Sequence, residues 1–154
     1  MKFKIFLIVV VFGLFGCMDK KPAQEEEGGG RYGMMSGDSA DMAALKFFDA
    51  IYNDNDMDVA LYYATDRMSR LLKSYHTPKA VARHIINLRY EGKVIMEIDA
   101  GDTVGRQEFA TKQRVSVYFS GHYQGDLIDE LRTVQMLRED GEWRVDSILT
   151  DKFL

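Results

Sequence analysis

The chain has 154 residues, of which 46% are hydrophobic and 29% charged, enough for one globular core and too few for two. Its 20 basic and 24 acidic residues give a net charge of −4, which argues against nucleic acid as a partner. The single cysteine excludes a disulfide within the chain, so its place in the sequence needs another explanation.

Residues 1–16 have the layout of a signal peptide. Lys2 and Lys4 precede an uninterrupted apolar stretch over residues 5–16. At about 12 residues this stretch has the length of a signal-peptide core and is too short to cross a hydrocarbon layer of about 30 Å. Leu14, three positions before Cys17, is too bulky for an ordinary signal peptidase that cuts at that point.

The segment Leu14-Phe15-Gly16-Cys17 resembles the lipobox of bacterial lipoproteins, although Phe15 is larger than the usual residue at its position. The resemblance implies that a diacylglycerol is attached to the Cys17 sulfur and that the chain is cut before this residue. A thiolate is the nucleophile that forms such a thioether, and two or three acyl chains give a stable anchor. We therefore expect a cell-envelope protein, lipid-anchored to a bacterial membrane outside the cytoplasm. Without residues 1–16 its net charge is −6.

Residues 17–37 are expected to form the anchor and a flexible tether. The segment after Cys17 contains Pro22, three glutamates at 25–27 and three glycines at 28–30, and it has no apolar periodicity. Twenty such residues span roughly 25 Å, which lifts a domain clear of lipid headgroups. The folded domain is accordingly expected over residues 38–154.

Apolar residues at helical spacing predict four helices in the first half of this domain. Asp38 or Ser39 caps the first, and the polar residues 53–56 end it. The second runs from about Met57 to Ala64. Thr65 is the expected cap of the third; Thr77 followed by Pro78 starts the fourth, and Gly92 is expected to end it.

After Gly92 the apolar period changes to two, which predicts strands. They are expected at residues 94–98, around 114–119, at 131–137 and from 143 onward, with a tight turn at Asp140-Gly141. In the last strand Trp143, Val145, Ser147 and Leu149 share one phase, which places the Trp143 ring in the core. Helices followed by strands predict an α+β fold, with N-terminal helices on a curved, mostly antiparallel four-stranded sheet.

Two segments resemble the NTF2-like superfamily of cone-shaped α+β domains: Phe47-Phe48-Asp49-Ala50-Ile51 and Gly141-Glu142-Trp143-Arg144-Val145-Asp146. The resemblance covers residues 39–150 and implies a sheet wrapped around helices to form a conical pocket. It implies no particular activity, because that fold carries enzymes, binding modules and scaffolds.

Acidic residues at alternate positions in Asp54-Asn55-Asp56-Met57-Asp58 suggest a calcium loop. The pattern fails, because its sixth and twelfth positions hold Val59 and Thr65 in place of Gly and Glu. We therefore interpret Asp56 as a helix cap. The sequence contains no metal-ligand cluster, Ser-centred elbow or phosphate loop, so we expect no metal and no cofactor.

Basic residues are concentrated in residues 65–93, where Asp66 and Glu91 are the only acids. The basic residues are Arg67, Arg70, Lys73, Lys79, Arg83, Arg89 and Lys93. Residues 38–58, by comparison, hold six aspartates against Lys46. The basic stretch either faces anionic lipid or an acidic partner, or is a solvated helical face, which we favour.

Proton transfer in an enzyme of this superfamily would need a base in the pocket. The candidates are His84 or His122 as base, with Asp99 or Tyr118 assisting. Neither histidine has an acidic partner at a diagnostic spacing, so exposed or structural histidines are favoured. The aromatic residues either line a ligand pocket or fill the core, and filling the core is favoured.

Three functions follow from these observations. The favoured one is a tethered, non-enzymatic module that binds a small apolar ligand or an envelope protein. The second is a pocket enzyme doing acid/base chemistry on a small molecule. The third is a structural envelope module that self-associates, for example as a homodimer. The partners expected are thus the membrane, through the lipid anchor, and a ligand or protein, with no nucleic acid.

Overall fold

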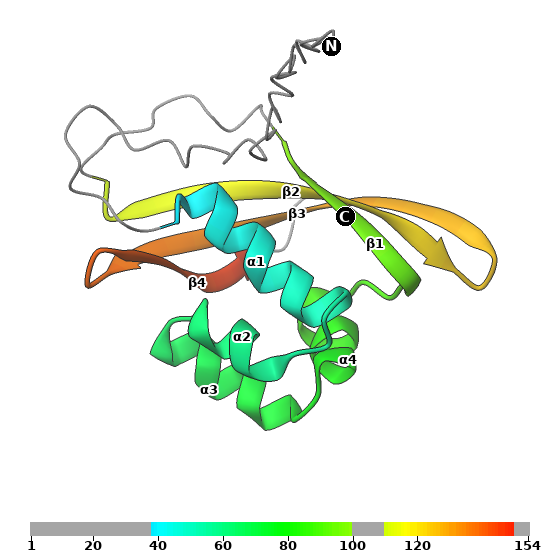
Figure 1. Ribbon diagram of the computed structural model, residues 1–154, viewed down its shortest axis with the longest axis horizontal. Coiled ribbons are helices and arrows are strands. Elements are labelled where there is room, and N and C mark those ends of the chain that lie inside the picture. The colour runs from blue at the N-terminus through cyan, green and yellow to red at the C-terminus, as the bar shows by residue number, and fades with distance from the viewer. Residues whose placement is uncertain (1–37, 100–109, 150–154) are drawn as a thin grey trace, which may run out of the picture.

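A layer of helices covers one face of an antiparallel sheet in the computed structural model, which describes residues 38–99 and 110–149 (Figure 1). The helices are α1 (Ala40–Tyr52), α2 (Met57–Tyr62), α3 (Asp66–Tyr75), α4 (Pro78–Val81) and the π-helix η1 (Ala82–Ile86). The strands β1 (Glu91–Ile98), β2 (Lys112–Tyr123), β3 (Asp126–Glu139) and β4 (Glu142–Leu149) lie in the order β1-β2-β3-β4. The predicted α+β class and four-stranded antiparallel sheet are confirmed. Cys17 and the expected signal peptide and tether lie outside the described residues.

The four predicted helix starts are confirmed by their caps. The side chains of Ser39, Asp56, Thr65 and Thr77 each accept a hydrogen bond from a backbone N–H in the first turn, at 2.9 to 3.3 Å. Each such cap stabilises its helix by about 1 kcal/mol. Asp56 thus has the capping role expected of it.

The predicted end of the last helix at Gly92 is wrong. The helix ends with η1, and Asn87 follows it in the left-handed conformation at φ 56°. Arg132 on β3 reaches this end and donates from Nε to the Ile86 carbonyl oxygen at 3.1 Å. That contact satisfies a carbonyl that the helix leaves free, and the Arg132 cation suits the negative end of the helix dipole. Gly92 instead lies in β1 at φ 77°, beside an irregularity in the pairing with β2.

The core lies between α1 and the sheet. Phe47, Phe48 and Phe119 are fully buried, and the rings of Phe48 and Phe119 meet edge to face at 4.9 Å between centroids. For these three aromatic residues, the expectation that they fill the core is confirmed. None of the described helices is both long and apolar enough to cross a membrane.

A β-bulge at Asp146 changes the phase of β4. Val145 lies opposite Met136, but Ile148 lies opposite Val134, so β4 has one residue more than β3 between these two pairs. Because Val134 and Met136 are both buried in the core, Val145 and Ile148 face the helices. The predicted alternation is therefore wrong beyond Val145, and Trp143 packs against the core only partly buried.

Candidate functional site

A groove of about 480 Å³ lies between α3, η1 and the second half of β4. Small-molecule sites commonly have volumes of about 300–1,000 Å³, so the groove has the size of a binding site. From α3 it is lined by Arg67, Met68, Leu71 and Tyr75, and from η1 by His84 and Ile85. From β4 it is lined by three consecutive residues, Asp146, Ser147 and Ile148.

The sequence of α3 produces two adjacent apolar stripes, one toward the core and one along the groove, and Met68 contributes to both. Met68 and Leu72 lie four positions apart and are buried in the core. Leu71 and Tyr75 form the adjacent stripe and line the groove, where Leu71 keeps 44% of its surface exposed. One helix therefore closes the core and offers an apolar wall to a ligand.

The wall opposite β4 is aromatic. The rings of Tyr75 and His84 stack with an interplanar angle of 20° and a centroid distance of 5.6 Å. His84 itself is exposed to solvent. The structure thus places this predicted candidate at a groove, against a tyrosine ring and not against a carboxylate.

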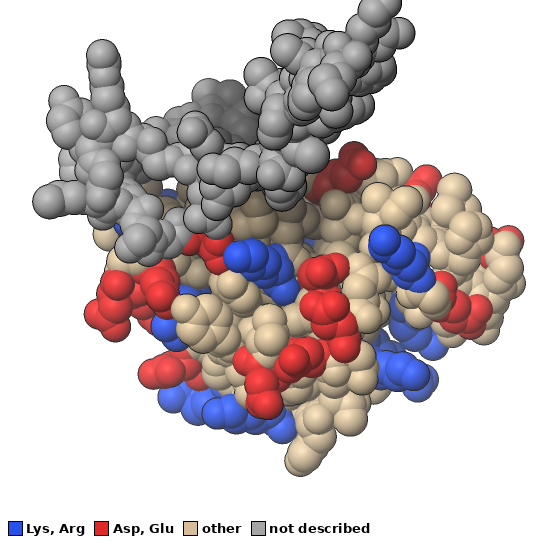
Figure 2. All heavy atoms as spheres, viewed as in Figure 1, with Lys and Arg blue, Asp and Glu red and all other residues tan. Residues whose placement is uncertain are grey.

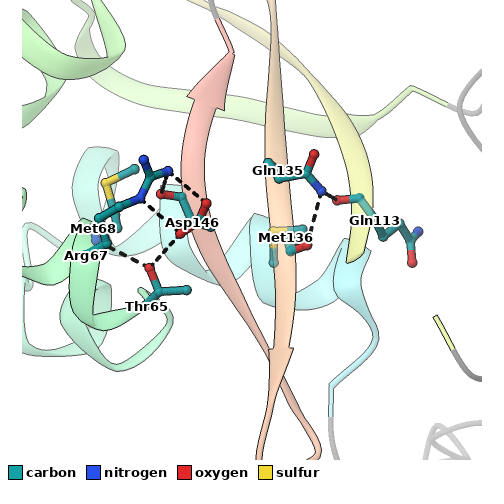
Figure 3. Close-up of polar contacts among 7 residues, drawn as sticks. All are labelled: Thr65, Arg67, Met68, Gln113, Gln135, Met136 and Asp146. Carbon is teal, nitrogen blue, oxygen red and sulfur yellow. Dashed lines mark hydrogen bonds and ion pairs between the residues drawn. The ribbon is translucent and has the colours of Figure 1, made fainter. Parts of the chain in front are cut away.

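The polar end of the groove is a closed network around Asp146, shown in Figure 3. Arg67 Nη2 donates to Asp146 Oδ2 at 2.8 Å, and Arg67 Nε donates to Oδ1 at 3.2 Å. The buried Thr65 hydroxyl also donates to Oδ1, at 3.2 Å, while it caps α3. Both carboxylate oxygens of Asp146 therefore accept hydrogen bonds, and the residue connects the bulge to α3. The same hydrogen bonds make Asp146 a poor general base.

The chain segment that leads into α3 covers part of the β4 edge. Val145 donates its N–H to the Tyr63 carbonyl oxygen at 2.7 Å, and its own carbonyl accepts from the Thr65 N–H at 3.0 Å. Ala64 and Val145 thereby form a parallel bridge. This contact could not be predicted from the sequence, because no pattern in residues 63–65 indicates a strand.

The other candidate residues lie far from this groove. Tyr118 and His122 are exposed on the sheet face opposite the helices, because the alternate residues Val117 and Phe119 are buried on the helix side. Partial desolvation and, next, the Asp129 carboxylate raise the pKa of the Tyr118 hydroxyl, which makes it a weaker acid.

Asp99 follows β1, where its N–H donates to the Ser116 carbonyl oxygen at 2.9 Å. β1 and β4 are the two edges of the sheet, three strand spacings or about 14 Å apart. The structure therefore does not bring Asp99, Tyr118 or His122 together with His84. Within the described residues no three His, Cys, Asp or Glu side chains are grouped as metal ligands.

The two charge types occupy different parts of the surface. Figure 2 shows Asp and Glu side chains over α2 and the loop before it, and Lys and Arg side chains along the lower margin, at α3. Arg67, Arg70, Lys73, Lys79 and Arg83 are all exposed. The basic residues therefore gather on the helices that form one side of the groove.

Comparison of the chain with protein-family models, with curated proteins and with solved structures gave no match. The architecture established by the structure is an α+β fold with a four-stranded antiparallel sheet.

Proposed function

We propose that this chain is an exported lipoprotein, anchored through Cys17, whose NTF2-like domain binds a ligand or an envelope protein without transforming it. Residues 1–16 are its signal peptide, residues 17–37 its anchor and tether, and residues 38–154 its binding domain. The groove between α3 and β4 is the observation on which the binding function depends.

The anchor is supported by the order of features at the N-terminus. Lys2 and Lys4, the apolar stretch over residues 5–16 and Cys17 follow one another at the spacing of a lipoprotein signal. The polar segment that follows gives the domain room to work beside the membrane.

The NTF2-like fold is supported by element order and layering. Four α-helices and the π-helix η1 precede an antiparallel sheet in sequence order, and the helices cover one face of that sheet. Irregular pairing in β1 and the bulge in β4 are features that bend strands, as a sheet wrapped around helices requires.

Binding is favoured over catalysis by the chemistry of the groove. Leu71, Tyr75, Ile85 and Ile148 give it apolar walls, which is typical of a binding site. Its one carboxylate, Asp146, is held by Arg67 and Thr65 and is poorly placed to move a proton. An enzyme based on His84 would need its assisting groups nearby, and the residues expected to assist lie across the sheet.

Self-association is the second candidate, supported by the outer face of the sheet. Ile95 and Leu127 each keep 58% of their surface exposed there, and Tyr118 keeps 39%. An exposed apolar face of this kind is suited to contact with a second copy.

The binding proposal is tested by native mass spectrometry of the full-length chain, purified in neutral detergent from its producing cells. We expect a bound component on the wild type that is lost in Leu71→Glu, because a carboxylate would disrupt the apolar wall. Ile95→Glu, the same kind of change at an exposed apolar residue of the outer sheet face, is the control and should keep the component. Retention in Leu71→Glu would contradict the groove as the site, and loss only in Ile95→Glu would favour the outer face.

A further inference from the structure

We propose that the open edge of β4 is a docking site for an extended acidic segment of a partner protein, which adds a strand beside Ile148 and fills the groove with alternate apolar side chains. This inference rests on the proposed binding function and names the class of partner. It follows from the direction of the groove, the free hydrogen-bonding groups of β4 and the surrounding charge.

The groove follows the backbone edge of β4. Ser147 and Ile148 are consecutive residues, yet both line it together with Asp146. Successive side chains of a strand point to opposite faces of the sheet, so neighbours share a groove only where it runs along the strand edge. A ligand in this groove therefore lies beside the β4 backbone.

The register shows where the backbone groups of Ile148 point. Val145 uses its N–H and carbonyl for Tyr63 and Thr65, so both groups point away from β3 and the Val145–Met136 pair is not hydrogen-bonded. Bonded and non-bonded pairs alternate along an antiparallel ladder, so Val134, two residues from Met136, is also at a non-bonded position. Ile148 lies opposite Val134, and its N–H and carbonyl therefore point outward into the groove.

The chain itself shows that this edge accepts a strand. The segment 63–65 pairs with Val145, and α3 begins directly after it at Asp66. Across residues 38–99 and 110–149, Val145 is the one β4 residue with backbone–backbone hydrogen bonds on this side of the sheet, and the Asp146 carbonyl oxygen accepts from Arg67 Nη2 at 3.1 Å. A partner strand would continue along the edge from the point where the chain's own segment leaves it.

The net positive charge of the helices that flank the groove favours an acidic partner. Besides Arg67, which pairs with Asp146, the helices from Asp66 to Ile86 carry four exposed Arg and Lys side chains and one Asp (Figure 2). Within the groove, Asp146 is already neutralised by Arg67. A strand whose apolar residues contact Leu71 and Tyr75 would place its polar residues toward this basic surface, where carboxylates are attracted and cations are repelled.

The probe for this proposal is a fluorescein-labelled, end-blocked peptide of five Val-Glu repeats, added to the full-length chain in neutral detergent. Fluorescence anisotropy should show saturable binding. Binding should be at least tenfold weaker for a Val-Lys repeat, and also for a peptide of the same composition with five valines followed by five glutamates. Leu71→Glu should weaken binding at least tenfold, while Ile95→Glu should leave it unchanged.

Hydrogen bonding to the edge is tested separately. Ile148→Pro removes the outward N–H without removing a ladder bond, so it should weaken peptide binding at least tenfold. On the wild type, amide exchange followed by NMR should show the Ile148 N–H protected at least tenfold more once the Val-Glu peptide is bound. That measurement does not depend on how well the proline variant folds.

Three results would overturn the proposal: no binding of the Val-Glu repeat, equal binding of the Val-Lys or block peptide, or unchanged exchange at Ile148 in the complex. The peptide tests can fail while native mass spectrometry still finds a component on the wild type that Leu71→Glu loses. The groove then binds a small molecule, and only the partner strand is refuted. If mass spectrometry also finds no such component, the proposed function is refuted as well.

Discussion

The side-chain amide of Asn53 bonds both backbone groups of Val94. Asn53 Nδ2 donates to the Val94 carbonyl oxygen at 3.1 Å, and the Val94 N–H donates to Asn53 Oδ1 at 2.9 Å. The amide thus acts as one rung of a ladder at the edge strand β1 and fixes the end of α1 to it. On the opposite edge, no side chain of the described residues bonds the backbone N–H and carbonyl of Ile148 in this way. That edge is therefore open to a partner.

Asn53→Ala should lower the free energy of unfolding by about 1–3 kcal/mol, because two backbone groups lose their partner. Asn53→Asp should cost at least as much, since a carboxylate cannot donate to the Val94 carbonyl oxygen and would face the Asp49 carboxylate, to which Asn53 Nδ2 donates at 2.6 Å. Urea titration of both variants measures the difference. Asp54→Ala, an exposed change next to it, is the control and should stay within about 0.5 kcal/mol of wild type. Equal stability of Asn53→Ala and the control would show that the rung contributes nothing.

Asp146 is expected to matter more for stability than Arg67, although the two form an ion pair. The Asp146 side chain is 18% exposed and also accepts from buried Thr65, whereas the Arg67 side chain is 64% exposed. Asp146→Ala should therefore cost about 1–3 kcal/mol, and Arg67→Ala less than about 1 kcal/mol. Chemical denaturation of the two single variants and the double variant gives the comparison. The reverse order would mean that the exposed pair, and not the Thr65 bond, holds α3 to the bulge.

Local features of the fold could be predicted from the sequence, whereas features set by distant partners could not. Ser39, Thr65 and Thr77 cap helices that follow immediately, so cap and helix are visible in one short window. The bulge at Asp146 depends on Arg67 and Thr65, which are 79 and 81 residues away. The apolar periodicity of β4 contains no sign of that contact. The prediction that Ser147 and Leu149 share a face with Val145 is wrong for this reason.

The candidate site shows the same division. His84 is one of the two candidate bases that the sequence offers for a pocket, and the structure places it at the groove. The edge of β4 could not be anticipated, because it exists only once the four strands are ordered and the segment 63–65 has paired with Val145. The end of η1 was missed because Arg132 comes from β3, 46 residues from the Ile86 carbonyl that it satisfies.

Gly121→Ala should destabilise the domain. A Cβ on Gly121 would lie 2.7 Å from Cδ1 of the Tyr90 ring, closer than side-chain carbons approach one another. The ring or the strand has to shift, and such overpacking costs about 1–3 kcal/mol. Thermal unfolding followed by circular dichroism measures the loss. Tyr90→Leu combined with Gly121→Ala should recover part of it if the clash with the ring is the cause, and no recovery would place the strain in the backbone.

Tyr90→Phe should leave stability unchanged or raise it by up to about 1 kcal/mol at pH 7, because the Tyr90 hydroxyl is buried with no hydrogen-bond partner among the described residues. Tyr52→Phe is the matched contrast and should cost about 0.5–1.5 kcal/mol, because the Tyr52 hydroxyl donates to the Leu88 carbonyl at 3.2 Å. Urea titration at pH 7 compares the two, and a larger loss in Tyr90→Phe would contradict the structure.

The advantage of Tyr90→Phe should grow in alkali. Burial raises the pKa of Tyr90 to about 12 in the folded chain, from 10.0 when exposed. Stability from the protonated phenol is complete below pH 10 and is lost as pH rises toward 12, because only the unfolded chain then releases the proton. The variant lacks this loss, which amounts to at most about 1.4 kcal/mol per pH unit. A constant difference between variant and wild type from pH 8 to pH 12 would contradict the raised pKa.

Cys17→Ser should abolish lipid attachment, because a serine hydroxyl cannot replace the thiolate that forms the thioether. Cells fed a radiolabelled fatty acid should label the wild-type chain and leave the variant unlabelled. Membrane fractionation should retain the wild type, since each buried methylene of its acyl chains contributes about 0.8 kcal/mol to anchoring. Phe15→Ala, which brings the residue before Gly16 closer to the usual lipobox, is the positive control and should label at least as well as wild type. Label on the serine variant would refute the anchor, and so would an unlabelled wild type that stays inside the cell.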